Sequence, residues 1–211
     1  YTSLRRDELA ALIDGAHPRG LRVTGHLCAV SFREAAELGI DSVEHGLWTD
    51  AGIFPARTPG RCPDSHALGQ IMAGIDLRGA MTQQIIADLV RNRVAVVSTL
   101  AMLESLAARS GVVDVRMRRV LAPPIRERWE STSVALPGRR KGYAMWERVL
   151  EEEMLFERLF AAAGGLLLAG QDPTGWGCCV AGFMDQRNIE LLVEAGFTAE
   201  HAIRIYSANG A

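Results

Sequence analysis

Two histidines lie 19 residues apart, and each follows a short apolar segment. His26 follows residues 21–25, and His45 follows residues 40–44. Short apolar segments are typical of buried strands, and in parallel β/α folds the chemically active side chains lie at the carboxyl ends of the strands. Neighbouring strands lie about 4.8 Å apart, so two imidazoles at one edge of such a sheet are close enough to bind one metal ion.

A carboxylate and a hydroxyl occupy equivalent positions later in the chain. Asp172 follows the apolar segment 166–169, and Thr99 follows the segment 94–98. Asp172 is suited to act as a further oxygen ligand, or to hold a metal-bound water and take its proton. A divalent metal lowers the pKa of bound water towards 7, and the resulting hydroxide can attack a carbonyl or phosphoryl centre. Spacing alone leaves two interpretations open: metal ligands, or structural histidines that only form hydrogen bonds.

The segments that must position these residues alternate between strand and helix patterns. Strands are predicted at the four apolar segments named above. Helical spacing and end signals predict helices at 4–17, about 32–38, after Thr82, within 101–163, near 185–195 and after Thr198. This repeating β/α order has a helical insertion before the last strand, and it fits either a doubly wound sheet or a β/α barrel.

Local signals refine this pattern. Ser31 and Glu34 have the spacing of a capping box at the start of a helix. Residues 47–80 carry several Gly and Pro and are expected to form a long loop with little regular structure. The later helical region is expected to be interrupted at Pro123-Pro124 and at Pro137-Gly138.

A long helix is expected after Lys141, with one buried face and one polar face. Its acidic residues Glu151–Glu153 are expected to be mostly solvated, because charge runs on helices usually face water. The residues expected to point inward are Trp146, Val149, Leu150 and Met154.

Composition limits the classes of partner and the compartment. The chain is 48% apolar and 23% charged with a net charge of −2, which gives no electrostatic reason to expect nucleic acid or an anionic membrane as a partner. No run of 18 or more apolar residues is present. Four cysteines, at 28, 62, 178 and 179, are too few for a disulfide framework and are expected to be free thiols, in a reducing compartment or buried in packing. A cytoplasmic location is therefore favoured, although a signal peptide upstream of Tyr1 would not be visible in this sequence.

The stretches around these residues resemble the amidohydrolase superfamily, most closely its imidazolonepropionase-like and prolidase-like branch. The stretch VTGHLC…SFREAAELGIDSVEHG resembles the fifth and sixth strand segments of that family, in which a histidine ends each strand. VAVVSTLAML is similar to the seventh strand, LLLAGQDPTG to the eighth, and NIELLVEAGFTAEHAIRIYSANGA to the helices that follow. The similarity is collinear and fails only in residues 50–80 and 101–160.

This resemblance implies a (β/α)8 TIM barrel, of which residues 1–211 form a partial domain, truncated at both ends, with about the last four β/α units. It also implies a metal-dependent hydrolase that cleaves the C–N bond of an amide, a cyclic amide or a dipeptide by a metal-activated hydroxide. His26 and His45 become metal ligands, and Asp172 becomes both a ligand and the acid/base group. One or two divalent ions are implied, with zinc expected.

The resemblance also implies ligands that these residues lack. Family members carry an H-x-H pair on the first strand and, in two-metal enzymes, usually a carboxylated lysine on the fourth. The only lysine, Lys141, lies in the helical insertion, and Gln171 stands where threonine is usual. The 211 residues are therefore expected to be inactive alone, to need the N-terminal half of the same protein, and to be prone to self-pairing as a homo-oligomer.

Weaker candidates and alternative functions remain. Trp48, Thr99 and Trp176 lie beyond strand ends, where lining a substrate pocket and ordinary packing are equally expected. The C-x-D-x-H stretch that ends at His66 is expected to be a solvated loop, and His17 and His201 are expected near the surface. The alternatives are a non-catalytic barrel that acts as a scaffold or binding subunit, and a phosphotriesterase-like hydrolase.

Overall fold

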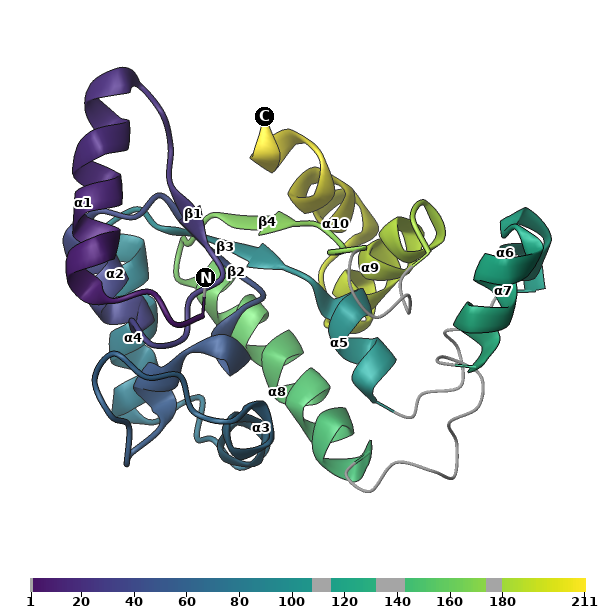
Figure 1. The fold of residues 1–211 in the computed structure, drawn as a ribbon, viewed down its shortest axis with the longest axis horizontal. Helices are drawn as coiled ribbons and strands as arrows, with labels where there is room; N and C mark the ends of the chain where they lie inside the picture. The colour runs from purple at the N-terminus through teal and green to yellow at the C-terminus, as the bar shows by residue number, and fades with distance from the viewer. Residues whose placement is uncertain (1, 108–114, 132–142, 174–179) are drawn as a thin grey trace.

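The strands of the chain form one parallel sheet. The computed structural model describes residues 2–107, 115–131, 143–173 and 180–211, and its four strands lie in the order β1-β2-β3-β4 (Figure 1). The strands are β1 (Thr24–Gly25), β2 (Ser42–Glu44), β3 (Ala95–Ser98) and β4 (Leu167–Ala169). All four predicted strands are therefore present, each shorter than its apolar segment, and the prediction of an α/β fold with a parallel sheet is confirmed.

The register of the sheet aligns the carboxyl ends of the strands. Val43 of β2 lies opposite Val96 of β3, and Val97 lies opposite Leu168 of β4. Successive strands in the sequence are neighbours in the sheet, which places the residues after each strand along one edge. Val43, Val96 and Leu167 are buried in β2, β3 and β4, as expected for a sheet covered by helices.

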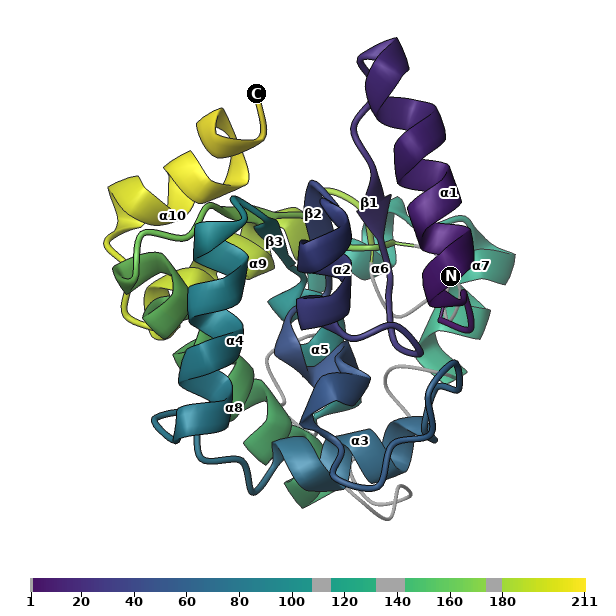
Figure 2. The same ribbon diagram turned by 90° about the vertical axis from the view of Figure 1, so that its left-hand side faces the viewer.

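Helices and short 3₁₀ turns connect and cover the strands. α1 packs on α2, α2 packs on α4, and α8 packs on α3 and α5 (Figures 1 and 2). The α-helices are α1 (Arg6–Ala16), α2 (Phe32–Leu38), α3 (Ser65–Met72), α4 (Ala80–Arg91), α5 (Leu100–Leu106), α6 (Val115–Val120), α7 (Pro123–Trp129), α8 (Tyr143–Ala162), α9 (Phe183–Glu194) and α10 (Ala199–Tyr206). The 3₁₀ turns are η1 (His17–Arg19), η2 (Leu47–Thr49), η3 (Ala51–Ile53) and η5 (Ala208–Gly210).

Helix ends follow local chemistry, with one correction to the sequence prediction. Ser31 and Glu34 form the expected capping box at the start of α2, and Thr198 caps α10. Thr82 does not cap α4, which begins two residues earlier after Gly79; its buried hydroxyl instead donates to the carbonyl of Asp76. Pro123-Pro124 begin α7, because proline is tolerated in the first turn of a helix. Pro137-Gly138 lie outside the described residues.

The segment 47–80 is more regular than expected. It contains η2, η3 and α3 in place of a long loop. The Asp64 carboxylate accepts hydrogen bonds from the backbone N–H groups of His66 and Ala67, and so starts α3 where the many glycines and prolines indicated a loop.

Cys28 and Cys62 form a disulfide that links the β1–α2 connection to the segment before α3. The prediction of free thiols is therefore wrong for these two residues. Cys28 is buried against Ala51 and Leu68, so packing brings this pair together across 34 residues of sequence. Cys178 and Cys179 lie outside the described residues.

The hydrophobic core lies between the sheet and its helices. The largest fully buried side chains include Phe32 of α2 and Phe156 and Phe160 of α8, whose two rings stack at 6.2 Å between centroids. Val43 and Val96 point into this layer and are fully buried. Within the described part of the chain, no helix is both long and apolar enough to cross a membrane.

Candidate functional site

The carboxyl edge of the sheet brings the predicted polar residues together. His26 directly follows β1, His45 follows β2, Thr99 follows β3, and Asp172 lies three residues after β4. The two imidazole rings lie 4.4 Å apart between centroids, and the Asp172 Oδ2 atom lies 3.9 Å from Nε2 of His45. His45 therefore forms the centre of the cluster.

The backbone at this edge is unusual at two of these residues. His45 has a φ of 70° and Asp172 a φ of 48°, so both adopt the left-handed region that side chains rarely occupy. Gly46, next to His45, has a φ of 79°. Such conformations cluster at functional sites and persist only where surrounding contacts hold them.

His45 is held more firmly than the other members of the cluster. Its side chain is only 7% exposed, whereas the side chain of Asp172 is 40% exposed and His26 is open to solvent. The Nδ1 atom of His45 lies 3.1 Å from the hydroxyl of Thr99. A hydrogen bond from Nδ1–H to this hydroxyl leaves the lone pair of Nε2 free on the side of Asp172.

The electrostatic surroundings keep both imidazoles neutral. Burial lowers the pKa of His45 to about 4; the nearby His26 lowers it further and the Asp172 carboxylate opposes the shift. Burial also lowers the pKa of His26. Neutral imidazole is the form that binds a metal ion, so both rings have a lone pair available at neutral pH.

The donors match the preferences of a divalent transition metal in type. Two imidazole nitrogens and one carboxylate oxygen form a three-residue set of the kind seen in catalytic zinc sites. Zinc bonds of 2.0–2.1 Å place tetrahedral ligand atoms roughly 3.3 Å apart, somewhat closer than the 3.9 Å between His45 and Asp172. No group of three or more His, Cys, Asp or Glu side chains within the described ranges is close enough to form a complete site as it stands.

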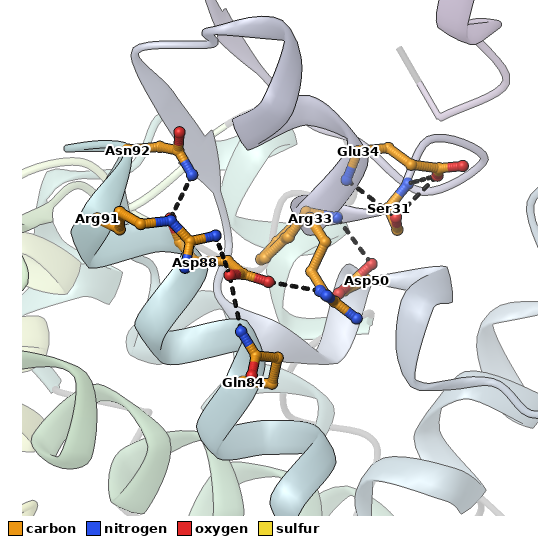
Figure 3. A network of polar contacts seen from close by, with 9 residues as sticks. Ser31, Arg33, Glu34, Asp50, Gln84, Asp88, Arg91 and Asn92 are labelled. Carbon is orange, nitrogen blue, oxygen red and sulfur yellow. Dashed lines mark hydrogen bonds and ion pairs between the residues drawn. The ribbon is translucent and has the colours of Figure 1, made fainter.

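A layer of polar contacts fixes α2, the helix that joins the two histidine-bearing strands (Figure 3). Arg33 of α2 donates to the Asp88 carboxylate of α4 at 2.6 Å, and Gln84 and Arg91 donate to the same carboxylate. On the other side, Asp50 accepts from the backbone N–H of Phe32 at 3.1 Å. These contacts hold α2 against its neighbours and so help set the spacing of β1 and β2.

A second set of contacts fixes the segment that carries Asp172. The preceding residue, Gln171, is buried and donates from Nε2 to the carboxylate of Asp185 at 2.9 Å. The same carboxylate accepts from the Tyr206 hydroxyl and from the backbone N–H of Gly182. Asp185 therefore ties α9 and α10 to this segment, a role that its sequence position alone does not indicate.

The acidic residues of α8 are the main correction to the predicted surroundings of the site. Glu153 is only 1% exposed and Glu157 is fully buried, so the prediction of a solvated acidic face is wrong at Glu153. The carboxylate of Glu153 accepts hydrogen bonds from the N–H groups of Leu47 and Trp48, just after His45. Glu153 and Glu157 lie three and seven residues after buried Leu150, and this helical spacing could have identified them.

The weaker candidates lie in varied surroundings. Trp48 is buried in the core and packs edge-to-face on Trp146, with 5.6 Å between centroids, so its pocket role stays a prediction. Trp176 lies outside the described residues. His66 is exposed near the disulfide-bonded Cys62, and Asp64 caps α3, so this stretch is not arranged as a metal site.

The remaining two histidines lie apart from the cluster. His17 lies 3.0 Å from the carboxylate of Asp41, and His201 is exposed and packs on Phe197. Both positions agree with the surface roles expected from the sequence.

Several solved structures are similar in fold to this chain. A crystal structure described as an amidohydrolase matches 99% of this chain with a TM-score of 0.55 and 16% identity, and bottromycin amidohydrolase matches 100% with a TM-score of 0.61 and 18% identity. The chain shares the fold of the matched part of these two structures. An uncharacterized protein is also similar over 99% of the chain, with a TM-score of 0.52 and 15% identity. Neither a protein-family profile nor a curated protein matches the sequence at a significant level.

The chain corresponds to only part of these amidohydrolase-like structures. It spans 36%, 47% and 37% of the three matched chains. Sequence identities of 15–18% define the shared fold only, so activity, metal and substrate must be argued from the site itself.

Proposed function

We propose that this chain belongs to a divalent-metal amidohydrolase that cleaves the C–N bond of an amide, a cyclic amide or a dipeptide, with zinc as the metal. The observation that supports this proposal most strongly is the convergence of His26, His45 and Asp172 at one edge of the sheet. The similarity to amidohydrolase structures supports the same class of reaction. We also propose that the sheet forms part of a (β/α)8 barrel, with further ligands contributed by residues outside this sequence.

The residues of this chain have separable roles in the proposed reaction. A bound divalent ion would supply Lewis acidity towards the substrate carbonyl and its attacking water. His26 and His45 would hold the ion through neutral imidazole nitrogens, and Thr99 fixes the ring of His45. The side chain of Asp172 is more exposed than that of His45. Its carboxylate takes a proton from the attacking water and returns it to the leaving nitrogen.

Metal analysis of the full-length protein tests this proposal. We expect near-stoichiometric zinc in the wild type, and His26→Ala or His45→Ala should lower the zinc content at least several-fold. Asp172→Asn should retain much of the metal and lower turnover of amide and dipeptide substrates about 10²–10⁴-fold, the usual contribution of a general acid/base. His201→Ala, an exposed histidine away from the cluster, is the matched control. Unchanged zinc content in both cluster variants would contradict the proposal.

A further inference from the structure

The backbone immediately after β2 adopts a conformation that ordinary side chains avoid. His45 and Gly46 are both left-handed, with φ values of 70° and 79°. A non-glycine residue in this region costs roughly 1–2 kcal/mol, and such strain persists only where surrounding contacts oppose it. Some group outside this turn must therefore hold it.

Glu153 of α8 provides that contact from a distant part of the sequence. Its Oε1 atom accepts a hydrogen bond from the N–H of Leu47 at 3.0 Å, and its Oε2 atom accepts one from Trp48 at 3.0 Å. These two N–H groups lie at the start of η2, where backbone donors have no partner within the turn. Both oxygens of a buried carboxyl group are thus used on the two residues that follow the turn.

Gly46 shows how closely the carboxylate approaches the turn. A Cβ atom at this position would overlap with the carboxylate of Glu153. The absence of a side chain at Gly46 therefore permits both the left-handed backbone and the close approach of Glu153. The ring of His45 is held separately, by the hydroxyl of Thr99 on Nδ1.

We propose that Glu153 is a positioning residue for His45, which fixes the strained turn after β2 from the helical layer and so aims Nε2 of His45 towards Asp172. This inference rests on the proposed metal site. Thr99 sets the rotation of the imidazole ring, whereas Glu153 sets the backbone from which the ring projects. Support of a metal-binding side chain by the groups behind it is the role that second-layer groups have at metal sites.

Two substitutions at Glu153 and one matched control test the inference in the full-length protein. Glu153→Ala removes both acceptors, whereas Glu153→Gln keeps the volume and one acceptor oxygen. Glu157→Gln is the control, because Glu157 is equally buried one helical turn further along α8, whereas the N–H groups of Leu47 and Trp48 donate to Glu153. The measurements are hydrogen exchange of the Leu47 and Trp48 amides, the NMR signals of the His45 ring in metal-free protein, and the zinc dissociation constant from chelator competition.

We expect Glu153→Ala to accelerate exchange of both amides at least 10-fold beyond the control, to shift the His45 ring signals and to weaken zinc binding about 10–100-fold. Glu153→Gln should give intermediate values, and it carries the test if the alanine variant does not fold. A folded Glu153→Ala protein with wild-type His45 signals and wild-type zinc affinity would overturn the inference. If wild-type protein binds no zinc, the proposed function fails, whereas the metal-free exchange and ring signals still decide the role of Glu153.

Discussion

Gly46 is the residue at which the candidate site meets the helical layer. On one side it continues the left-handed backbone of His45, and on the other it lies against the buried carboxylate of Glu153. The carboxylate cannot move aside cheaply, because both of its oxygens accept backbone hydrogen bonds. The geometry of the site therefore depends on a residue that carries no functional group.

Substitution of Gly46 should destabilise the fold for two reasons that can be measured separately. We expect Gly46→Ala to lower the free energy of unfolding by about 2–4 kcal/mol, from left-handed strain together with overlap on Glu153. Gly20→Ala is the matched control: Gly20 has a φ of 67° but no atom within 4 Å of its added Cβ, so it should lose only about 1 kcal/mol. Urea denaturation of the three proteins measures this difference. Equal losses in both variants would show that contact with Glu153 adds nothing.

The sequence located some of these residues but not the groups that hold them. His26, His45 and Thr99 were predictable because each directly follows a strand, and Asp172 because it lies three residues after one; strand-end position is a local property. The contacts of Glu153 were not predictable, because they join residues 105 and 106 positions apart. Its burial was predictable from helical spacing, but the neighbouring acidic residues suggested a face in water.

α2 and its connections set the spacing of the two histidine-bearing strands. The capping box of Ser31 and Glu34 starts the helix, and Arg57 pairs with the same Glu34 through two hydrogen bonds. Arg57 lowers the pKa of the Glu34 carboxyl to about 2. The disulfide from Cys28 adds a covalent link from the connection before α2 to the segment after η3.

Removal of the disulfide should destabilise this region more than any single polar contact. The bridge closes a loop with a sequence separation of 34 residues, and its removal in Cys28→Ser/Cys62→Ser should lower the free energy of unfolding by about 3–4 kcal/mol. Chemical denaturation under oxidising conditions measures the loss. Reductant should produce a similar loss in the wild type and none in the double variant; identical stability of the two proteins would show that the bridge does not form.

The sequence predicted helices and strands correctly where a local signal determines them. The capping box predicted α2 from Phe32 to Leu38, and the four apolar segments predicted the four strands. The sequence failed at 47–80, where glycines and prolines indicated a loop although Asp64 starts α3. It also failed at Cys28 and Cys62, because packing between segments that are distant in the sequence brings these two residues together.

The molecule as a whole buries carboxyl groups between its sheet and its helices. Glu153, Glu157 and Asp50 have at most 1% of their surface exposed. Burial raises the pKa of Asp50 to about 6 and that of Glu153 to about 8, and it also raises the pKa of Glu157, with the neighbouring Glu153 adding to the effect. Burial is the largest effect on both glutamates, so both side chains favour the neutral form in the folded protein.

These groups make the stability of the fold depend on pH. In unfolded chains a glutamate ionises near 4.3, whereas burial raises the pKa of Glu153 to about 8 in the folded state and also raises that of Glu157. The folded state therefore binds more protons than the unfolded state, and its stability falls as pH rises through this range. Below about pH 6.5 the buried neutral His45 opposes this trend, because its lowered pKa favours stability at higher pH. The effect of the two glutamates on stability is therefore best measured between pH 6.5 and pH 8, where His45 does not oppose it.

We expect the free energy of unfolding to decrease between pH 6.5 and pH 8 by up to about 1.4 kcal/mol per pH unit for each of the two glutamates. Glu157→Gln keeps the size of the side chain but cannot ionise, so its slope should be about half that of the wild type. Urea denaturation at several pH values in this window measures both slopes. A wild-type stability that stays constant or rises over the window would mean that the two carboxyl groups are ionised and compensated in the folded protein, contrary to their buried positions.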